Sequence, residues 1–135
     1  MINTERSLIL DVDGTLCPTK GDGETYASVR PFADMIELVR TYKQRGFYII
    51  LSTARNMRTH NGNVGRINAD TLKTLLAWLD EHEVPYDEVH VAKPWPGEGG
   101  FCVDDRTIRP SEFRTLDYEA ILALLDREAA PTGAG

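Results

Sequence analysis

Short apolar runs alternate with stretches of helical periodicity, and this alternation limits the possible folds more than any other feature. The apolar runs predict four buried strands, at Ser7–Asp11, Phe47–Leu51, Glu88–Val91 and Phe101–Val103. Between them, apolar side chains recur at helical spacing after Pro31, after Asn68 or Asp70, and over Leu116–Glu128. This order is typical of βαβ units. We therefore predict a three-layer, Rossmann-like α/β fold, with a mostly parallel sheet and helices on both faces.

Length and charge narrow the class of protein. A chain of 135 residues can hold one hydrophobic core, so we predict a single domain over residues 1–128 and a frayed tail over 129–135. No apolar run approaches the roughly 20 residues that span a bilayer, and Met1–Arg6 does not resemble a signal peptide. We therefore expect a cytoplasmic protein that does not bind membranes. The net charge of −6 argues against binding to long nucleic acid.

Polar side chains follow each of the four predicted strands. In open parallel sheets, ligands bind at the carboxyl ends of the strands. The side chains expected there are carboxylates, hydroxyls and one amine, namely Asp11, Asp13, Ser52, Thr53, Lys93, Asp104 and Asp105. Two carboxylates about 4 Å apart repel by roughly 4 kcal/mol, so such a cluster calls for a cation. Oxygen ligands without His or Cys favour Mg²⁺, which also binds substrate phosphate.

The run Asp11-Val12-Asp13-Gly14-Thr15 resembles motif I of the haloacid dehalogenase (HAD) superfamily of phosphotransferases. Thr53, Lys93 and the pair Asp104-Asp105 are similar to motifs II, III and IV, in that order along the chain. The segments Ser52–Arg58, Lys93–Trp95 and Val103–Arg106 further resemble the small capsule biosynthesis phosphatases. This likeness covers nearly the whole chain and implies a HAD fold.

The resemblance implies a role for each motif residue. Asp11 would attack phosphorus to form an aspartyl phosphate, and Asp13 would be the general acid and then the general base. Thr53, with Ser52 as its competitor, would bind a phosphoryl oxygen. Lys93, with Lys73 as its rival, would neutralise charge on both Asp11 and the phosphoryl group. The implied Mg²⁺ ligands are Asp11, the backbone carbonyl of Asp13, and Asp105, with Asp104 as the neighbour that competes for that role.

Residues beside the motifs are candidates for substrate binding. Gly14 allows a tight turn beside the phosphate. The other candidates are Arg55, Asn56, Arg58, Trp95 and Arg106. Residues 16–29 form a flap-like excursion, and no insertion is long enough for a large cap domain. An uncapped site suits a bulky substrate or closure by a neighbouring subunit, so a homo-oligomer is possible.

We therefore predict a Mg²⁺-dependent phosphomonoesterase, acting on a small phosphorylated metabolite. The resemblance points to a phosphorylated sugar or polyol of capsular polysaccharide biosynthesis. One alternative is a phosphatase of nucleic-acid ends, which the net acidic charge disfavours. A second alternative is a phosphoacceptor receiver domain. The order of the motifs disfavours a receiver, because the adjacent acids come last and no Asp ends the third strand.

Overall fold

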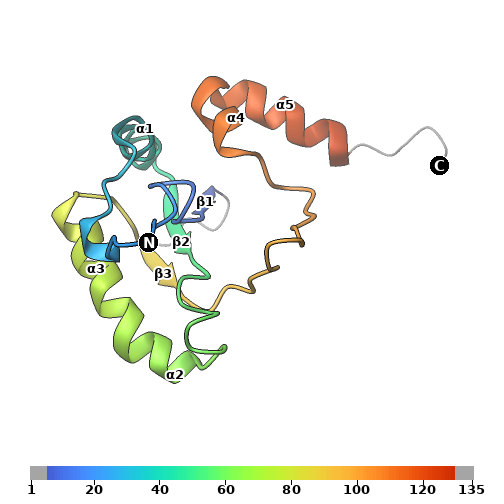
Figure 1. The fold of residues 1–135 in the computed structure, drawn as a ribbon. Coiled ribbons are helices and arrows are strands. Elements are labelled where there is room, and N and C mark those ends of the chain that lie inside the picture. The colour runs from blue at the N-terminus through green and yellow to red at the C-terminus, as the bar shows by residue number, and fades with distance from the viewer. Residues whose placement is uncertain (1–5, 130–135) are drawn as a thin grey trace. The chain divides into compact units, whose positions relative to one another are not determined.

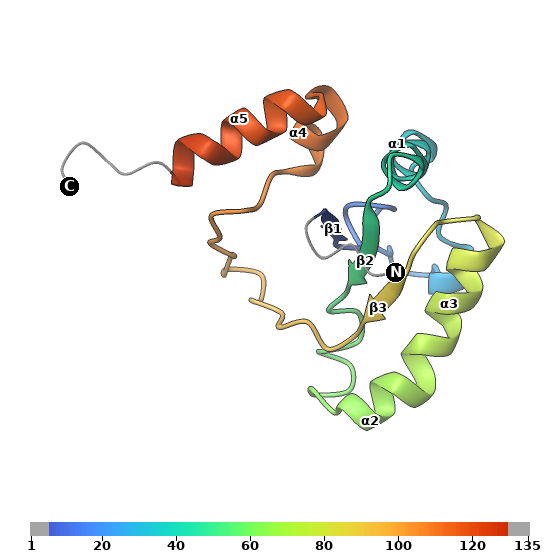
Figure 2. The same cartoon turned by 180° about the vertical axis from the view of Figure 1, so that it is seen from behind.

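The computed structural model describes residues 6–129 and divides the chain into two units, Met1–Trp95 and Pro96–Gly135. The first unit contains the sheet, and the second contains two helices (Figures 1 and 2). The prediction of one domain over residues 1–128 stays a prediction. The predicted frayed tail falls outside the described residues, apart from Ala129 at the end of the last helix.

The first unit is built on a parallel sheet with the order β1-β2-β3 (Figure 1). Its strands are β1 (Ser7–Leu10), β2 (Tyr48–Ser52) and β3 (Glu88–His90). Helices α1 (Ala33–Gln44) and α3 (Leu72–Glu81) lie between successive strands in the chain. The predicted α/β, Rossmann-like fold with a parallel sheet is therefore confirmed. Within residues 6–129, no insertion in this unit forms a large cap domain.

Apolar side chains of the two helices and of one sheet face form the core of this unit. The buried side chains are Leu10, Ile49 and Leu51 from the sheet, Met35, Ile36, Val39 and Tyr42 from α1, and Leu75, Trp78 and Leu79 from α3. Arg40 of α1 donates hydrogen bonds to the carbonyls of His82 and Glu83, so the turn that follows α3 lies against α1. Gly46 follows α1 with a φ of 95°, a conformation that suits glycine at a helix end.

The second predicted helix begins earlier than its sequence pattern indicates. Asn63, and neither Asn68 nor Asp70, caps the helix, because its side chain accepts a hydrogen bond of 3.1 Å from the Arg66 N–H. A short helix α2 (Val64–Arg66) and a π-helical turn η2 (Ile67–Thr71) then lead directly into α3. The loop that follows β2 therefore ends at Asn63.

The flap-like segment 16–29 is anchored at both ends. Leu16 and Val29 are buried, and the carbonyl of Leu16 accepts a hydrogen bond of 2.8 Å from the Phe32 N–H. The Trp78 indole donates a hydrogen bond of 2.7 Å to the Val29 carbonyl. Between these anchors lies the 3-10 turn η1 (Tyr26–Ser28), which Thr25 and Ser28 cap reciprocally. The segment is therefore short, ordered and fixed against α3.

The second unit contains α4 (Pro110–Thr115) and α5 (Tyr118–Ala129). The predicted helix over Leu116–Glu128 is thus displaced by two residues at its start, where Asp117 accepts a hydrogen bond from the Ala120 N–H. The prediction of a fourth strand is wrong, because Phe101–Val103 makes no strand pairing. A run of three apolar residues shows a tendency to extend, but a strand also needs a paired neighbour. No helix among the described residues is long and apolar enough to cross a membrane.

Candidate active site

Polar residues that follow the strands meet at one edge of the sheet. Asp11 directly follows β1, and Thr53 directly follows β2. The Thr53 N–H donates a hydrogen bond of 2.9 Å to the carbonyl of His90, the last residue of β3. The Lys93 N–H donates one of 3.1 Å to the Thr53 carbonyl. The backbone thus continues the sheet just far enough to bring these functional groups together.

Asp11 is half-buried, with the Lys93 ammonium and the Asp13 carboxylate as its charged neighbours. The Lys93 ammonium lies 3.6 Å from its Oδ1, and the Thr15 hydroxyl donates a hydrogen bond of 3.3 Å to its Oδ2. Burial raises the pKa of Asp11, and the nearby Asp13 carboxylate raises it further. Lys93, the Val12 N–H and the Thr15 hydroxyl oppose this rise by stabilising the charged form. The structure therefore pairs Asp11 with Lys93, as the sequence predicts.

Asp13 is held by Arg55 through both of its carboxylate oxygens. Nε of Arg55 donates a hydrogen bond of 3.1 Å to Oδ2, and Nη2 donates one of 2.9 Å to Oδ1. The Arg55 side chain is 1% exposed and that of Asp13 is 22% exposed. Such a two-point pair fixes the orientation of the carboxylate as well as its position. Arg55 is thus a buried partner of Asp13, and its predicted role in substrate binding stays a prediction.

Two backbone features support the turns around these residues. Gly14 has a φ of 88°, and its N–H donates a hydrogen bond of 2.7 Å to the Cys17 carbonyl, which closes the turn after Asp13. Ala92, just before Lys93, has a φ of 63°, which is rare for a residue with a side chain. Such strained positions gather where a fold must aim a functional group. Both lie beside a predicted catalytic residue.

Cys17 is a buried thiol close to Asp13. Burial raises the pKa of Cys17 to about 12, and the Asp13 carboxylate adds to the rise. Its Sγ lies 3.7 Å from Oδ1 of Asp13. A thiol with so high a pKa stays protonated at neutral pH and is a poor nucleophile. Asp11, and not Cys17, is the candidate nucleophile of this unit.

Among the substrate-binding candidates that follow motifs II and III, one has its side chain in structural hydrogen bonds and two are exposed. Asn56 is occupied structurally, since its Oδ1 accepts a hydrogen bond of 2.8 Å from the Thr71 hydroxyl and its Nδ2 donates one of 3.3 Å to Thr59. Arg58 and Trp95 are exposed, and the Arg58 guanidinium lies 5.8 Å from the centre of the Trp95 ring. This contact joins the loops that follow β2 and β3. Arg58 and Trp95 therefore offer a positive charge and an aromatic face to a ligand.

Asp104, Asp105 and Arg106 belong to the second unit and are exposed. The Asp104 carboxylate accepts a hydrogen bond of 2.8 Å from the Arg106 N–H, which forms a local turn. The predicted roles of these three residues in metal and substrate binding stay predictions from the sequence motif.

The donor set of the first unit fits Mg²⁺, although the described residues contain no group of three or more His, Cys, Asp or Glu side chains placed to hold a metal ion. Mg²⁺ needs few protein ligands, because it commonly binds through one or two carboxylates together with water and substrate phosphate. The Asp11 carboxylate and the Asp13 carbonyl are hard oxygen donors of this kind. Burial and the neighbouring Asp13 carboxylate raise the pKa of Asp11, and a cation there would stabilise the charged form of Asp11.

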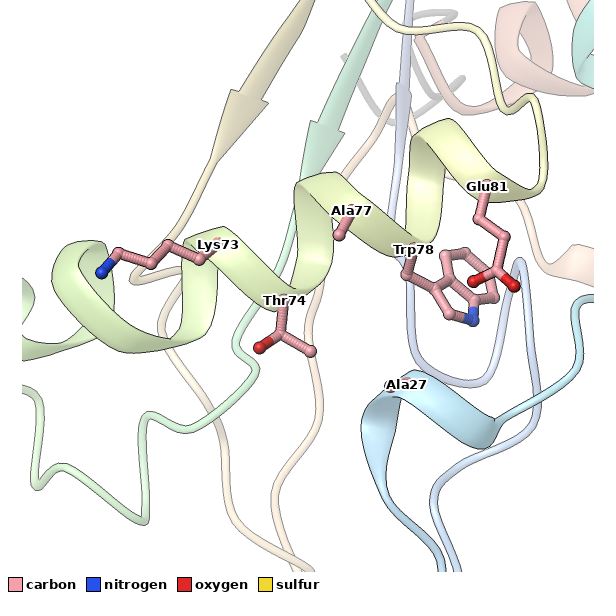
Figure 3. A pocket seen from close by; sticks show the side chains of 6 residues that line it. All are labelled: Ala27, Lys73, Thr74, Ala77, Trp78 and Glu81. Atoms are coloured by element: carbon pink, nitrogen blue, oxygen red, sulfur yellow. The ribbon is translucent and has the colours of Figure 1, made fainter.

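The structure also bears on the two open alternatives. Thr53 is buried and its Oγ1 accepts a hydrogen bond of 3.1 Å from the backbone N–H of Arg55. Lys73 does not share this position. It lines a cavity of about 310 Å³ between η1 and α3, together with Ala27, Thr74, Ala77, Trp78 and Glu81 (Figure 3). The geometry thus places Lys93, and not Lys73, beside Asp11, while the choice of Thr53 over Ser52 stays a prediction.

Two residues near the site were missed by the sequence analysis. Thr15 lies inside the first motif, so its contact with Asp11 could have been anticipated from the motif itself. The contact made by Tyr26 could not have been anticipated, because Tyr26 lies in the flap-like segment and belongs to no motif. Its ring centre lies 4.2 Å from the Arg55 guanidinium carbon.

Comparison with known proteins supplies a relative but no activity. No family model matches the chain, and no curated protein matches it. The crystal structure of an MCSG target from Vibrio cholerae is 51% identical to this chain, with a TM-score of 0.86. The match covers 91% of this chain and 98% of the Vibrio cholerae chain. The chain belongs to the family of this Vibrio cholerae protein. That protein's name states no reaction, so the likeness supports the fold and leaves the function to the site.

Proposed function

We propose that this protein is a Mg²⁺-dependent phosphomonoesterase that works through an aspartyl-phosphate intermediate. One observation carries the proposal: Lys93 lies 3.6 Å from Asp11 at the strand edge where Thr53 also lies. This arrangement offers a carboxylate nucleophile, a cation and a hydroxyl to one phosphoryl group. The order of these residues in the chain agrees with the motifs that resemble the HAD superfamily.

The reaction would proceed in two displacements. An oxygen of Asp11 attacks phosphorus in line, the Asp11 O–P bond forms, and the ester P–O bond breaks. Asp13 donates a proton to the departing alcohol oxygen. Asp13 then takes a proton from a water molecule that attacks the phosphoryl group, which releases inorganic phosphate and restores the Asp11 carboxylate.

The other residues would stabilise charge. Lys93 and the Thr53 hydroxyl would bind phosphoryl oxygens as negative charge develops on them. Mg²⁺ would be held by the Asp11 carboxylate and the Asp13 backbone carbonyl, and when bound it supplies further neutralisation of the phosphoryl oxygens. Asp105, with Asp104 beside it, is the further metal ligand that the motif predicts. Gly14 would let the backbone approach the phosphate closely.

For the substrate, we propose a phosphorylated sugar or polyol of capsular polysaccharide biosynthesis in the cytoplasm. The resemblance to the capsule biosynthesis phosphatases supports this class. The exposed pair of Arg58 and Trp95 also supports it, because an aromatic face with a nearby cation suits a polar ring that carries hydroxyl or acidic groups. Arg106 is a further candidate from the motif. A homo-oligomer remains part of this proposal, since a neighbouring subunit is one way to close an uncapped site.

The test is phosphate release from phosphorylated sugars, polyols, nucleotides and a phosphorylated oligonucleotide, with Mg²⁺ and with EDTA. We expect release that requires Mg²⁺, is greatest for a sugar or polyol phosphate, and falls by at least about 10³-fold in Asp11→Asn. Asp11→Asn preserves the shape of the side chain and removes its nucleophilic charge. Full activity of that variant would contradict the mechanism. Preference for the oligonucleotide would instead support a phosphatase of nucleic-acid ends.

A further inference from the structure

Both carboxylate oxygens of Asp13 are engaged by a single side chain. Arg55 donates hydrogen bonds of 2.9 and 3.1 Å to them, and the Arg55 side chain is 1% exposed. A guanidinium buried to this degree requires a paired anion, and Asp13 supplies that anion in this structure. Because each carboxyl oxygen has two lone pairs, the two-point contact with Arg55 sets which lone pairs of Asp13 can carry the acidic proton and in which direction that proton points.

Tyr26 covers the same guanidinium from another direction. Its ring centre lies 4.2 Å from Cζ of Arg55, within the range of a cation–π contact. Tyr26 is the first residue of η1, whose cap is formed by reciprocal hydrogen bonds of 3.1 and 3.2 Å between Thr25 and Ser28. Tyr26 of the flap-like segment thus packs on the guanidinium that holds Asp13.

The guanidinium of Arg55 also has one nitrogen that makes no hydrogen bond to the residues that the structure describes. This nitrogen is Nη1, and it is buried. A buried donor without a partner raises the free energy of the arrangement that contains it. A phosphoryl oxygen bound within reach of Nη1 would satisfy this donor and would favour a small rotation of Arg55 toward it. The same rotation would free one oxygen of Asp13.

We propose that Arg55 is a positioning residue for the general acid Asp13, and that Tyr26 holds Arg55 in place, so that the flap-like segment controls the proton-transfer step. This inference rests on the proposed function, because it assigns Asp13 the role of acid. It differs from a purely structural role in one respect. Loss of Arg55 or Tyr26 should matter most when the leaving group needs a proton.

The experiment compares two esters that differ in their leaving groups. An aryl ester such as p-nitrophenyl phosphate releases a stable phenolate and needs little help from an acid, whereas an alkyl ester such as glycerol phosphate releases an alcohol that must be protonated. Arg55→Lys keeps the charge and loses the two-point contact. We expect kcat to fall at least about 10-fold more for the alkyl ester than for the aryl ester. Arg40→Lys, the same change on α1, should leave both rates unchanged.

A second pair of variants tests whether Tyr26 acts on Asp13 through Arg55, and it leaves the Arg55 side chain unchanged. Tyr26→Leu removes the aromatic face over Arg55, and we expect a selective loss on the alkyl ester in the same direction. Tyr26→Phe keeps the ring and should match the wild type. If Arg55→Lys does not fold, as judged by circular dichroism, the Tyr26 pair alone decides. In the Asp13→Asn background, Arg55→Lys should cause no further loss of selectivity, because it acts through Asp13.

The outcomes separate the two proposals. Equal losses on both esters in the folded variants, or losses that persist in the Asp13→Asn background, would overturn the positioning role and leave the proposed function standing. Hydrolysis of neither ester by the wild type with Mg²⁺ would overturn the proposed function, and the positioning role with it. Selective loss on the alkyl ester that disappears without Asp13 supports both.

Discussion

Asp11 is a residue whose charge opposes folding. Burial raises the pKa of Asp11 above its ordinary value of 3.8, so the folded state favours the protonated form. Stability from this group is full below the unfolded pKa and is lost as the pH rises through the folded pKa. We therefore expect Asp11→Asn to unfold at pH 7 with a free energy equal to or greater than that of the wild type.

Urea denaturation between about pH 3 and pH 7 checks this prediction. The wild type should gain stability relative to Asp11→Asn as the pH falls, because only the wild type has a carboxylate to protonate at position 11. Lys93 loses a partner in the variant, but its side chain is 35% exposed and water can solvate it. A variant clearly less stable than the wild type at pH 7 would show that the Lys93 contact outweighs burial.

Asp13 should behave in the opposite way. Asp13→Ala leaves the Arg55 guanidinium, with its 1% exposed side chain, without its anion. We expect a loss of about 3 kcal/mol in the free energy of unfolding, near the lower end for a broken buried pair because Asp13 is partly exposed. Asp11→Ala is the matched control and should lose less than about 1 kcal/mol, the usual scale for an exposed pair. Equal losses would mean that Arg55 finds another partner.

At the scale of elements, Trp78 connects α3 to the end of the flap-like segment. Its indole donates a hydrogen bond of 2.7 Å to the Val29 carbonyl, and both residues are buried. Trp78→Phe leaves that carbonyl without its donor and opens space around it. We expect a loss of about 2 kcal/mol and faster amide hydrogen exchange in the segment 16–29.

The second tryptophan provides the control for this prediction. Trp95 is 45% exposed, so Trp95→Phe should change the free energy of unfolding by less than about 0.5 kcal/mol. Both free energies can be measured by denaturation with circular dichroism. Unchanged exchange in the segment 16–29 of Trp78→Phe would show that the Phe32–Leu16 hydrogen bond alone anchors it.

Elements that are signalled by their own residues were predictable, and those that depend on partners were not. The runs that form β1 and β2 are rich in Ile and Leu, so their own residues indicate strands, whereas β3 (Glu88–His90) has Val89 as its single apolar residue. Phe101–Val103 is apolar throughout but makes no strand pairing. The start at Val64 was missed because the residues of α2 and η2 are mostly polar, and only the side chain of Asn63 signals the cap.

The same distinction applies to the site. Asp11, Thr53 and Lys93 were predictable as neighbours, because the strand ends of a parallel sheet meet at one edge. The pairing of Arg55 with Asp13, and the contact of Tyr26 with Arg55, depend on how a loop and a turn pack against that edge. Linear spacing carries no signal for such contacts.

At the scale of the whole molecule, the proposed metal should stabilise the folded protein. A ligand that binds only the folded state adds about 2.7 kcal/mol at 100 times its dissociation constant, which is worth several degrees in Tm for a chain of this size. We expect Mg²⁺ to raise the Tm of the wild type and to have a much smaller effect on Asp11→Asn. Because the chain carries a net charge of −6, NaCl at equal ionic strength is the control for screening.

The same measurement tests the acids of the second unit. Asp104 accepts a backbone hydrogen bond from Arg106, which an asparagine can also accept, so Asp104→Asn preserves the local turn. If Asp105 is the ligand that the motif predicts, Asp105→Asn should remove most of the Mg²⁺-dependent rise in Tm and Asp104→Asn only a small part. The reverse order would assign the metal to Asp104. A full Mg²⁺-dependent rise in Tm in both variants would mean that neither Asp104 nor Asp105 is needed to bind the ion. The Asp11 and Asp13 oxygens would then be the protein ligands of Mg²⁺.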